Sequence, residues 1–333
     1  MLYLYRILLG LEVLLLFLIT SCGSPSRPSN TRNTKMVSKN TTVSSFTSDT
    51  ITAMLPNSKF AYNFEVPNEK FKLSKELKEI SGLTCYKDKW LAAVQDEKGA
   101  IYLIDMNTGN TEDVIEFSAD GDYEGIACVK EVFYTLRADG VLFQIKNWKG
   151  KQKKVRTKVV DTNLGEMNDT EGLAFDPFKN QLLIACKASA AIGERKTDAR
   201  AVYAYDLKKN KFDIEPIFLL SRKTFKKYIK KNIEENPSFK AYLKEIKKAK
   251  KEMLLEPSAI AIHPISNDFY LLSAAGNSLI VLDRSFNIKY LKRLNPKRFE
   301  QPEGLAFNSR GDLFISSEGL KKKARIYKFD YLP

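Results

Sequence analysis

The chain has 333 residues, of which 44% are hydrophobic and 28% charged, and its formal net charge is +14. This length and hydrophobic content allow a large buried core in one main domain. The single histidine, His263, excludes histidine-rich metal sites, and the sequence contains no phosphate-binding loop of the P-loop type. High positive charge alone identifies no partner, and we expect no nucleic acid among the partners.

The N-terminal segment has the features of a bacterial lipoprotein signal. Arg6 precedes an apolar run over residues 7–19, which is too short to span a bilayer and is interrupted by Glu12. The run ends in Ile19-Thr20-Ser21-Cys22-Gly23, a sequence similar to a lipobox, in which cleavage leaves Cys22 as an acylated N-terminus. More than one acyl chain holds a protein firmly on a membrane, so Cys22 predicts stable anchoring. Because of Glu12, an ordinary signal peptide or an uncleaved start stays open as an alternative.

Residues 23–58 are rich in Ser, Thr, Asn and Pro and have little to bury, which predicts a disordered tether. We therefore divide the chain into a signal peptide at residues 1–22, the tether at 23–58 and a folded domain at 59–333. These features predict a protein of the bacterial cell envelope, anchored in the outer membrane through lipidated Cys22. They leave open which face of that membrane the domain occupies.

Five segments of the folded domain share one pattern, in which a polar start is followed by a small residue and an apolar end. The small residues recur about every 45 residues, with one gap of about twice that length, and they are Gly82, Gly125, Gly172, Ala259 and Gly304. Each segment continues with short runs rich in Val, Ile, Tyr and Phe. A meander repeated five times at this period predicts an all-β fold, a five-bladed β-propeller. Glycine in the first strand of a blade is expected where inner strands crowd around the axis.

The ends of the repeat array indicate how the ring closes. The last repeat is one strand short, and a strand-like run at residues 60–66 precedes the first repeat. We expect this run to supply the missing outer strand, because closure removes an exposed sheet edge.

The long gap between the third and fourth repeats contains a basic insert at residues 221–255. Its apolar residues recur at helical spacing, and Asn236-Pro237-Ser238 interrupts the pattern, with Ser238 as the cap of a second helix. We therefore predict two helices inserted between blades three and four. Their apolar faces should pack on the propeller and their charges should face water, while adsorption to an anionic membrane is the alternative.

The three cysteines after Cys22 lie within predicted strands. Cys85, Cys128 and Cys186 are an odd number at wide spacing, which is typical of neither a disulfide framework nor a zinc site. We interpret them as small buried hydrophobic residues.

The repeats resemble those of the SdiA-regulated family, which are bacterial envelope proteins distantly related to NHL-repeat propellers. The resemblance covers residues 76–329 and rests on five motifs in order, Glu79-Ile-Ser-Gly-Leu, Ala93-Val-Gln-Asp-Glu97, Tyr123-Glu-Gly-Ile-Ala127, Thr170-Glu-Gly-Leu-Ala174 and Pro302-Glu-Gly-Leu-Ala306. It implies a five-bladed propeller with a calcium site and no established activity.

Carboxylates are expected to gather at one mouth of the ring, because the end of each second strand lies beside the start of the first. Unpaired acids held close together raise one another's pKa, so cations or basic side chains must compensate. The strand geometry predicts that Glu124 pairs with Arg137 and that Glu171 pairs with Lys187. We interpret these four residues as structural pairs lining the mouth.

The carboxylates of the first and fifth repeats have no basic partner in their own motifs. Hard oxygen donors without His or Cys favour calcium or magnesium over zinc, and weak calcium binding is common in extracellular modules. We therefore predict a calcium site at the mouth, with solvent-exposed acids as the alternative. The predicted ligands are Glu79, Asp96, Glu97, Glu303 and Glu318. His263 follows a first strand, so it should lie away from this mouth in a structural position.

The predicted function is that of a monomeric binding module whose mouth receives a small ligand or an envelope protein. One alternative is a metal-dependent hydrolase, phytase-like or lactonase-like, since a mouth metal can activate water and Pro302-Glu303-Gly304 is similar to a motif of phytase-like propellers. Its anionic substrate would need a positive lining, for which the candidates are Arg137, Lys187, Arg195, Lys196 and Arg200. A scaffold without catalysis is the third hypothesis, because the propeller fold does not determine function.

Overall fold

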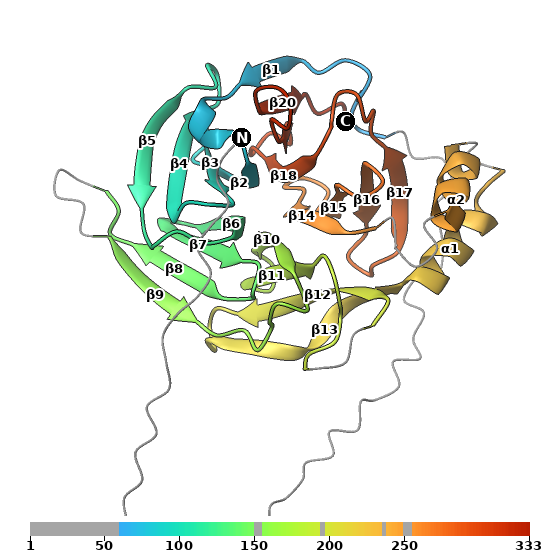
Figure 1. Cartoon of the computed structure of the whole chain (residues 1–333), viewed down its shortest axis with the longest axis horizontal. Helices are drawn as coiled ribbons and strands as arrows, with labels where there is room; N and C mark the ends of the chain where they lie inside the picture. Colours follow the sequence, from blue (N-terminus) through green and yellow to red (C-terminus); the bar gives the residue numbers. More distant parts are fainter. Residues whose placement is uncertain (1–59, 150–154, 194–196, 235–237, 249–254) are drawn as a thin grey trace, which may run out of the picture. The chain divides into compact units, whose positions relative to one another are not determined.

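The computed structural model describes residues 60–149, 155–193, 197–234, 238–248 and 255–333. They form five four-stranded antiparallel sheets arranged as blades around a central axis (Figure 1). The prediction of an all-β, five-bladed propeller is confirmed. The predicted signal peptide, Cys22 and the tether lie outside the described residues, as do Arg195 and Lys196. In the part of the chain that is described, no helix is long and apolar enough to span a membrane.

Four blades are meanders of consecutive strands, each running from the axis outward. The first two consist of β2 (Ile80–Tyr86), β3 (Trp90–Gln95), β4 (Ala100–Asp105), β5 (Thr111–Glu116), and β6 (Tyr123–Val129), β7 (Val132–Arg137), β8 (Leu142–Lys146), β9 (Arg156–Val160). The next two consist of β10 (Thr170–Asp176), β11 (Gln181–Cys186), β12 (Ala199–Asp206), β13 (Lys211–Ser221), and β14 (Pro257–Ile262), β15 (Phe269–Ser273), β16 (Ser278–Leu282), β17 (Ile288–Arg293).

The remaining blade joins the two ends of the domain. It holds β18 (Pro302–Phe307), β19 (Leu313–Ser317), β20 (Arg325–Phe329) and, as its outer strand, β1 (Glu69–Lys72), with Glu69 opposite Lys328. A short 3-10 helix, η1 (Lys75–Leu77), leads from β1 into β2. An N-terminal strand therefore closes the ring, as the missing strand of the last repeat predicted.

The closing strand is not the run that the sequence pattern indicated. Residues 60–66 form no strand, and Tyr62 and Phe64 instead insert into the core between the β14–β17 blade and the β18–β20 blade. Arg298 donates hydrogen bonds to the carbonyls of Phe64 and Glu65. Alternating aromatic residues thus serve as anchors here. The actual strand β1 is short and mostly charged, as suits an edge strand, with Phe71 as its buried residue.

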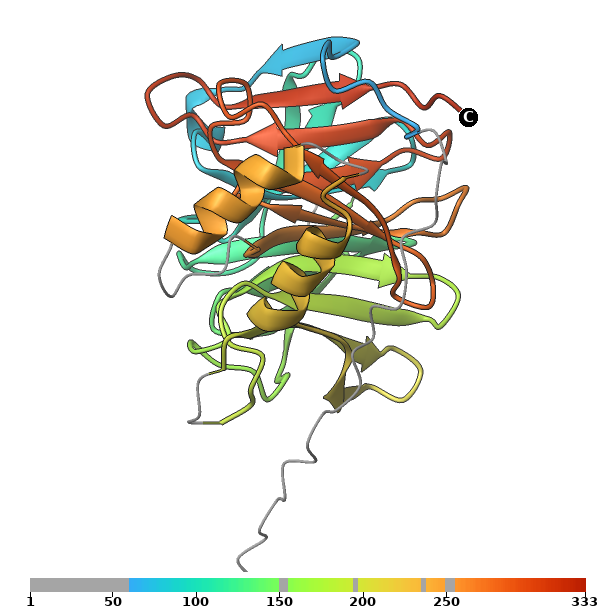
Figure 2. The ribbon, with the colours of Figure 1, turned by 90° about the vertical axis from the view of Figure 1, so that its right-hand side faces the viewer.

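Two helices follow β13 and precede β14, which confirms that the basic insert is helical. They are α1 (Arg222–Lys231) and α2 (Ser238–Lys248), and they lie along the outer edge of the ring (Figures 1 and 2). Counted from the blade that contains β1, they lie between blades four and five and not between blades three and four. The repeat pattern begins at β2, whereas the chain enters the ring one strand earlier, at β1. Ser221 caps α1 by accepting a hydrogen bond from the Thr224 amide at 3.1 Å.

The inner strands β2, β6, β10, β14 and β18 approach one another closely around the axis. A Cβ on Gly82 would lie 2.8 Å from the Glu124 carbonyl oxygen, and one on Gly125 would lie 2.6 Å from the Glu171 carbonyl oxygen. Because real Cβ atoms do not come so near to backbone atoms, these glycines are required by the narrow centre of the ring.

The ring has its own hydrophobic cores and is closed by its own strands. Five clusters of buried hydrophobic side chains fill the spaces between and beside the blades. The described residues of the range Ser48–Pro333 belong to one compact unit. With its own cores and its own closure, this unit is expected to fold by itself.

Candidate cation-binding mouth

One end of the central channel is lined by acidic residues, and we call it the polar mouth. Its members precede or begin the inner strands or follow the second strands of the blades, and they are Glu79, Asp96, Glu97, Asp122, Glu124, Asp169, Glu171, Lys187, Glu303 and Glu318. The structure therefore brings together the five predicted metal ligands and three of the four residues predicted to pair.

Local backbone geometry directs three glutamates into this mouth. Glu124, Glu171 and Glu303 occupy equivalent positions in β6, β10 and β18, each directly before a glycine. The pairing register shifts at each of these positions, which marks a β-bulge or a similar irregularity in the inner strand. A bulge changes the direction of a side chain, and here the backbone irregularity coincides with the residue that lines the channel.

The rim of the mouth is formed by carboxylates that oppose one another's ionisation. Burial, together with the negative charges of Glu79 and Glu97, raises the pKa of Asp96 to about 6. Burial and the charge of Asp96 likewise raise the pKa of Glu318 to about 7. Gln301 partly offsets this by donating a hydrogen bond of 2.9 Å to Glu318 Oε1. These shifts show that the rim carboxylates of the first and last repeats act as one electrostatic group.

Deeper in the channel lie the three glutamates of the inner strands, of which Glu171 and Glu303 are buried and Glu124 is half-buried. Burial, followed by the charges of Glu318 and Glu124, raises the pKa of Glu303 to about 8. Burial and the neighbouring Glu171 raise the pKa of Glu124 to about 10. Burial and Glu303 also raise the pKa of Glu171 well above its usual range. Glu124 and Glu303 thus favour the protonated form near neutral pH.

Lys187 is the basic side chain that enters this acidic group. Its Nζ pairs with Glu171 Oε1, which confirms the predicted pair between β10 and the end of β11. Burial alone would lower the pKa of Lys187, but the carboxylates of Glu171, Asp169 and Glu303 outweigh it and raise that pKa. Lys187 therefore stays charged and neutralises part of the polar mouth.

The second predicted pair, Glu124 with Arg137, is wrong. Arg137 instead forms a two-pronged ion pair with Asp139, with Nε–Oδ1 and Nη2–Oδ2 distances of 2.9 and 2.7 Å. Asp139 lies two residues along the chain in the turn after β7, so it meets the guanidinium at little entropic cost. Glu124 is left facing Glu171 and Asp122.

The remaining candidate for a positive lining is also neutralised. Arg200 lies in β12 and pairs with Glu256 across 3.6 Å. Since Arg137 pairs with Asp139 and Arg200 with Glu256, Lys187 is the one of these candidates, among the described residues, whose charge lies within the acidic group. The polar mouth therefore has an excess of carboxyl groups over basic partners.

Two buried carboxylate oxygens of the mouth, Asp96 Oδ1 and Glu171 Oε2, have no hydrogen-bond partner in the described part of the chain. As the side chains of the described residues stand, no group of three or more His, Cys, Asp or Glu is placed to hold a metal ion. The donor chemistry nevertheless fits a hard cation, since the group consists of carboxylate oxygens with unpaired capacity and insufficient compensating charge. The side chains that would hold such an ion are those predicted from the sequence, in particular Asp96, Glu303 and Glu318.

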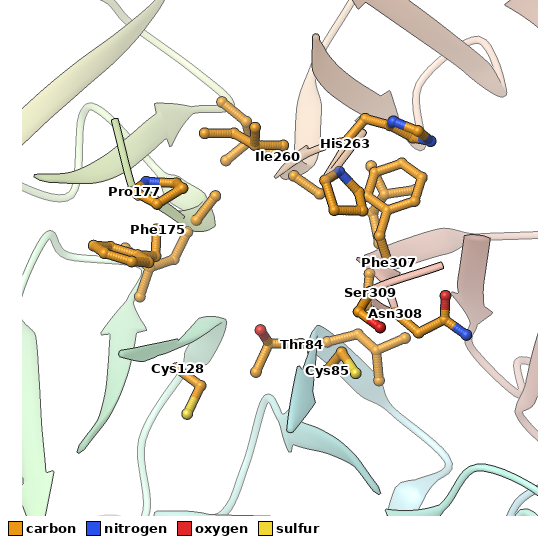
Figure 3. A pocket seen from close by; sticks show the side chains of 18 of the residues that line it. Thr84, Cys85, Cys128, Phe175, Pro177, Ile260, His263, Phe307, Asn308 and Ser309 are labelled. Carbon is orange, nitrogen blue, oxygen red and sulfur yellow. The ribbon is translucent and has the colours of Figure 1, made fainter. Parts of the chain in front are cut away.

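The opposite end of the channel has a different character that the sequence analysis did not single out. A pocket of about 450 Å³ opens there between the far ends of the inner strands (Figure 3). Phe175, Ile260 and Phe307 line it, with Cys85 and Cys128 along one side. The apolar ends of the five repeat motifs were the signal for this pocket.

His263, Cys85 and Cys128 line this second pocket, whereas Cys186 ends β11 beside Lys187. His263 is buried away from the polar mouth, as predicted, and its Nδ1 accepts a hydrogen bond of 3.0 Å from the Ser266 amide. Burial lowers the pKa of His263 to about 4, so the ring is neutral. Of the cysteines, Cys186 is buried as expected, whereas Cys85 and Cys128 are half-buried. Burial raises the pKa of both thiols to about 12, so they are protonated at neutral pH.

Comparison with known proteins agrees with the repeat pattern. The model of the SdiA-regulated family matches residues 204–329, which confirms the resemblance over the last two blades and part of the blade before them. No curated protein matches the chain.

Solved structures resemble this chain only in outline. A glutaminyl cyclase from Myxococcus xanthus has 9% identity and a TM-score of 0.49, covering 80% of this chain and 97% of its own. A PQQ-bound aldose sugar dehydrogenase from Streptomyces coelicolor has 12% identity and a TM-score of 0.44, covering 80% and 100%. A streptogramin B lyase has 12% identity and a TM-score of 0.41, covering 79% and 72%. Likenesses of this size say nothing about activity.

Proposed function

We propose that this protein is a lipid-anchored propeller of the bacterial cell envelope whose polar mouth binds calcium and serves as a binding module for a small ligand or an envelope protein. The observation that carries the calcium site is the set of raised pKa values in the mouth, about 6 for Asp96, 7 for Glu318 and 8 for Glu303. Carboxyls with such values are held together without enough positive charge around them.

A divalent cation supplies the missing charge and lets these carboxyls ionise together. Asp96, Glu303 and Glu318 would hold the ion, with Glu79 and Glu97 at the rim. Calcium is favoured over zinc because the donors are carboxylate oxygens, and over magnesium because calcium accepts irregular coordination by side chains from several strands.

Binding at this site has a distinctive signature, because protons must leave when calcium enters. Near pH 7 the Glu303 carboxyl is largely protonated and that of Glu318 is partly protonated, given their pKa values of about 8 and 7. Ligating carboxylates are deprotonated, so calcium binding should release protons and should tighten as pH rises from 6 to 8.

The test is calorimetric titration of calcium into chelator-treated Ser48–Pro333 in two buffers of different ionisation enthalpy. We expect saturable binding, with a Kd of about 10⁻⁴–10⁻³ M, and apparent heats that differ between the buffers by the protons released. Absence of saturable heat in both buffers would exclude the calcium site. Saturable binding with no proton release would place calcium elsewhere on the domain.

The proposed anchor rests on the sequence at residues 19–23, where an apolar run ends in Thr20-Ser21-Cys22-Gly23. Acylation at Cys22 would hold the domain at the outer membrane through the tether proposed at residues 23–58. This part of the proposal is tested by acylation and membrane partition of the full chain.

One observation also favours a second candidate function, that of a metal-dependent hydrolase of phosphate esters or lactones. Glu303 is 5% exposed with a pKa of about 8, a value suited to a general acid or base near neutral pH. The test is hydrolysis of model phosphate esters and lactones with and without calcium. Turnover that needs calcium and is lost in Glu303→Gln would establish the hydrolase, and no turnover would leave the binding module.

A further inference from the structure

The exposed face of α1 is entirely basic. The helix contains six basic residues and no acidic one, and they are Arg222, Lys223, Lys226, Lys227, Lys230 and Lys231. Its apolar residues Phe225, Tyr228 and Ile229 are buried in the core that the helix shares with β13 and β17. The charges therefore cover the side of α1 that faces away from the propeller.

Five of these basic residues surround one hollow of about 490 Å³, the remaining lining residue being Asp198. Lys223, Lys226, Lys227 and Lys230 form no ion pair with any residue in the described ranges. The four lysines thus lie close together with no ion-pair partner among the described residues, and the single carboxylate of Asp198 does not balance their charge.

This arrangement disfavours the isolated helix. Lys223 and Lys227, like Lys226 and Lys230, are separated by four residues on one helix face, a spacing at which like charges repel. The first turn contains basic residues where the helix dipole favours acidic ones. Anions bound at the hollow would relieve both effects.

We propose that the basic face of α1 binds the phosphate groups of an anionic lipid bilayer and holds the edge of the propeller against the membrane surface. The helices lie on the outside of the ring, where both are accessible from one side (Figure 2). The exposed Lys240, Lys244, Lys247 and Lys248 of α2 extend the charged surface. Because the apolar faces of both helices are packed in the core, binding occurs by adsorption without insertion.

The same side chains disfavour nucleic acid as the partner. Single-stranded nucleic acids are held by exposed aromatic platforms, yet the aromatic residues of the two helices, Phe225, Tyr228, Phe239 and Tyr242, are all buried. Five of the six basic residues of α1 are lysines. A lysine acts as a point charge and lacks the planar guanidinium with which arginine forms bidentate hydrogen bonds to bases and phosphates. This inference depends neither on the calcium site nor on acylation of Cys22.

The test is sedimentation of Ser48–Pro333 with vesicles of phosphatidylcholine alone and of phosphatidylcholine mixed with phosphatidylglycerol. The fragment lacks Cys22, so any binding comes from the domain. We expect binding to the mixed vesicles at low salt, and release at high salt because of screening. The quadruple variant Lys223→Glu, Lys226→Glu, Lys227→Glu and Lys230→Glu should lose about a hundredfold or more in vesicle affinity.

The matched control changes net charge equally at exposed lysines elsewhere, Lys179→Glu, Lys208→Glu, Lys211→Glu and Lys321→Glu. It should keep most of the vesicle binding. Equal binding to both kinds of vesicle, or equal losses in the two quadruple variants, would overturn the proposal. The proposal would also be overturned if the fragment bound single-stranded DNA or inorganic polyphosphate but did not bind the vesicles. The lysines would then be a binding site for a soluble polyanion.

Discussion

Glu171 and Lys187 form an ion pair in which the two partners differ sharply in exposure. The side chain of Glu171 is 3% exposed and that of Lys187 is 34% exposed. The second oxygen of Glu171, Oε2, has no hydrogen-bond partner among the residues that the structure describes. Lys187 therefore extends from the solvent to Glu171 and is the ion-pair partner of that carboxylate among the described residues. Loss of the lysine charge would leave the negative charge of Glu171 buried and unpaired.

Replacing Lys187 by Met should destabilise the domain. Breaking a buried pair costs about 3–5 kcal/mol, because it leaves one charge unpaired. The exposure of Lys187 lowers the expected loss to about 2 kcal/mol in free energy of unfolding. Urea unfolding of Ser48–Pro333 measures it, and adding Glu171→Gln should recover most of the loss. The control Lys98→Met breaks the exposed pair with Asp120 and should change stability little. Equal effects of the two lysine changes would contradict this interpretation.

The polar mouth should make the calcium-free domain less stable as pH rises. Folding raises the pKa of Asp96 to about 6, of Glu318 to about 7 and of Glu303 to about 8. A carboxyl with a raised pKa in the folded state holds its proton more tightly there than when unfolded. Its stabilising effect is complete below the unfolded pKa and is lost as pH passes through the folded pKa. The free energy of unfolding should therefore fall between about pH 4.5 and pH 8.

Urea unfolding at several pH values checks this dependence. The double variant Glu303→Gln and Glu318→Gln should flatten it, and calcium should restore stability at pH 8 in the unmodified domain. A free energy of unfolding that rises steadily from pH 5 to pH 8 without calcium would contradict the assignment of these carboxyls.

Gly82 should tolerate no side chain. The atoms of β6 nearest to it belong to the backbone, with the Glu124 carbonyl oxygen and the Ile126 amide nitrogen each 2.8 Å from where a Cβ would lie. Gly82→Ala must therefore push two inner strands apart, at about 1–3 kcal/mol in free energy of unfolding. Gly165→Ala is the control, because nothing lies within 4 Å of its Cβ position. Thermal unfolding of both variants decides the point, and similar melting temperatures would show that the inner strands are not packed as described.

The N-terminal segment should contribute stability through its buried aromatic residues. Phe64 is 4% exposed and packs against Phe329 with ring centroids 4.9 Å apart, whereas Val66 is 68% exposed. Phe64→Ala should cost about 3–5 kcal/mol in free energy of unfolding, and Val66→Ala should cost little. A Phe64→Ala domain with unchanged stability would show that residues 60–66 are not part of the folded ring.

The proposed anchor depends on one side chain. Cys22→Ser in the full chain should abolish acylation and move the protein from the detergent phase to the aqueous phase in a detergent partition assay. Cys128→Ser is the control, since Cys128 lies within the ring, and it should leave partition unchanged. Retention of Cys22→Ser in the detergent phase at high salt would contradict lipid anchoring, while retention only at low salt would indicate the basic face of α1.

The repeat pattern predicted the architecture because it reports a local steric need repeated five times. Glycine at Gly82 and Gly125 is required by the approach of neighbouring inner strands, so the period of the small residues is the period of the blades. The closing strand was placed wrongly because alternating Phe60, Tyr62 and Phe64 have the pattern of a strand, while β1 is short and charged. Alternation of apolar residues shows only that every second side chain is buried. In this segment the aromatic side chains are buried against two neighbouring blades and not within a sheet.

The polar mouth was predictable only where strand geometry alone brings residues together. Glu171 and Lys187 meet because β10 and β11 are neighbours in an antiparallel sheet. Arg137 was assigned to Glu124 by the same argument, but Asp139 competes from the adjacent turn. The grouping of Glu124, Glu171 and Glu303 depends on the bulges that direct them to the axis, and periodicity does not reveal bulges.

The most direct test of the calcium-binding mouth is the calcium affinity of Glu303→Gln compared with that of unmodified Ser48–Pro333. Glu116→Gln, at an exposed carboxyl at the end of β5, is the matched control. We predict saturable calcium binding by the unmodified domain and the control, and an affinity reduced about tenfold or more in Glu303→Gln. Equal calcium affinities in all three proteins, or no saturable binding by any of them, would contradict a calcium site in the polar mouth.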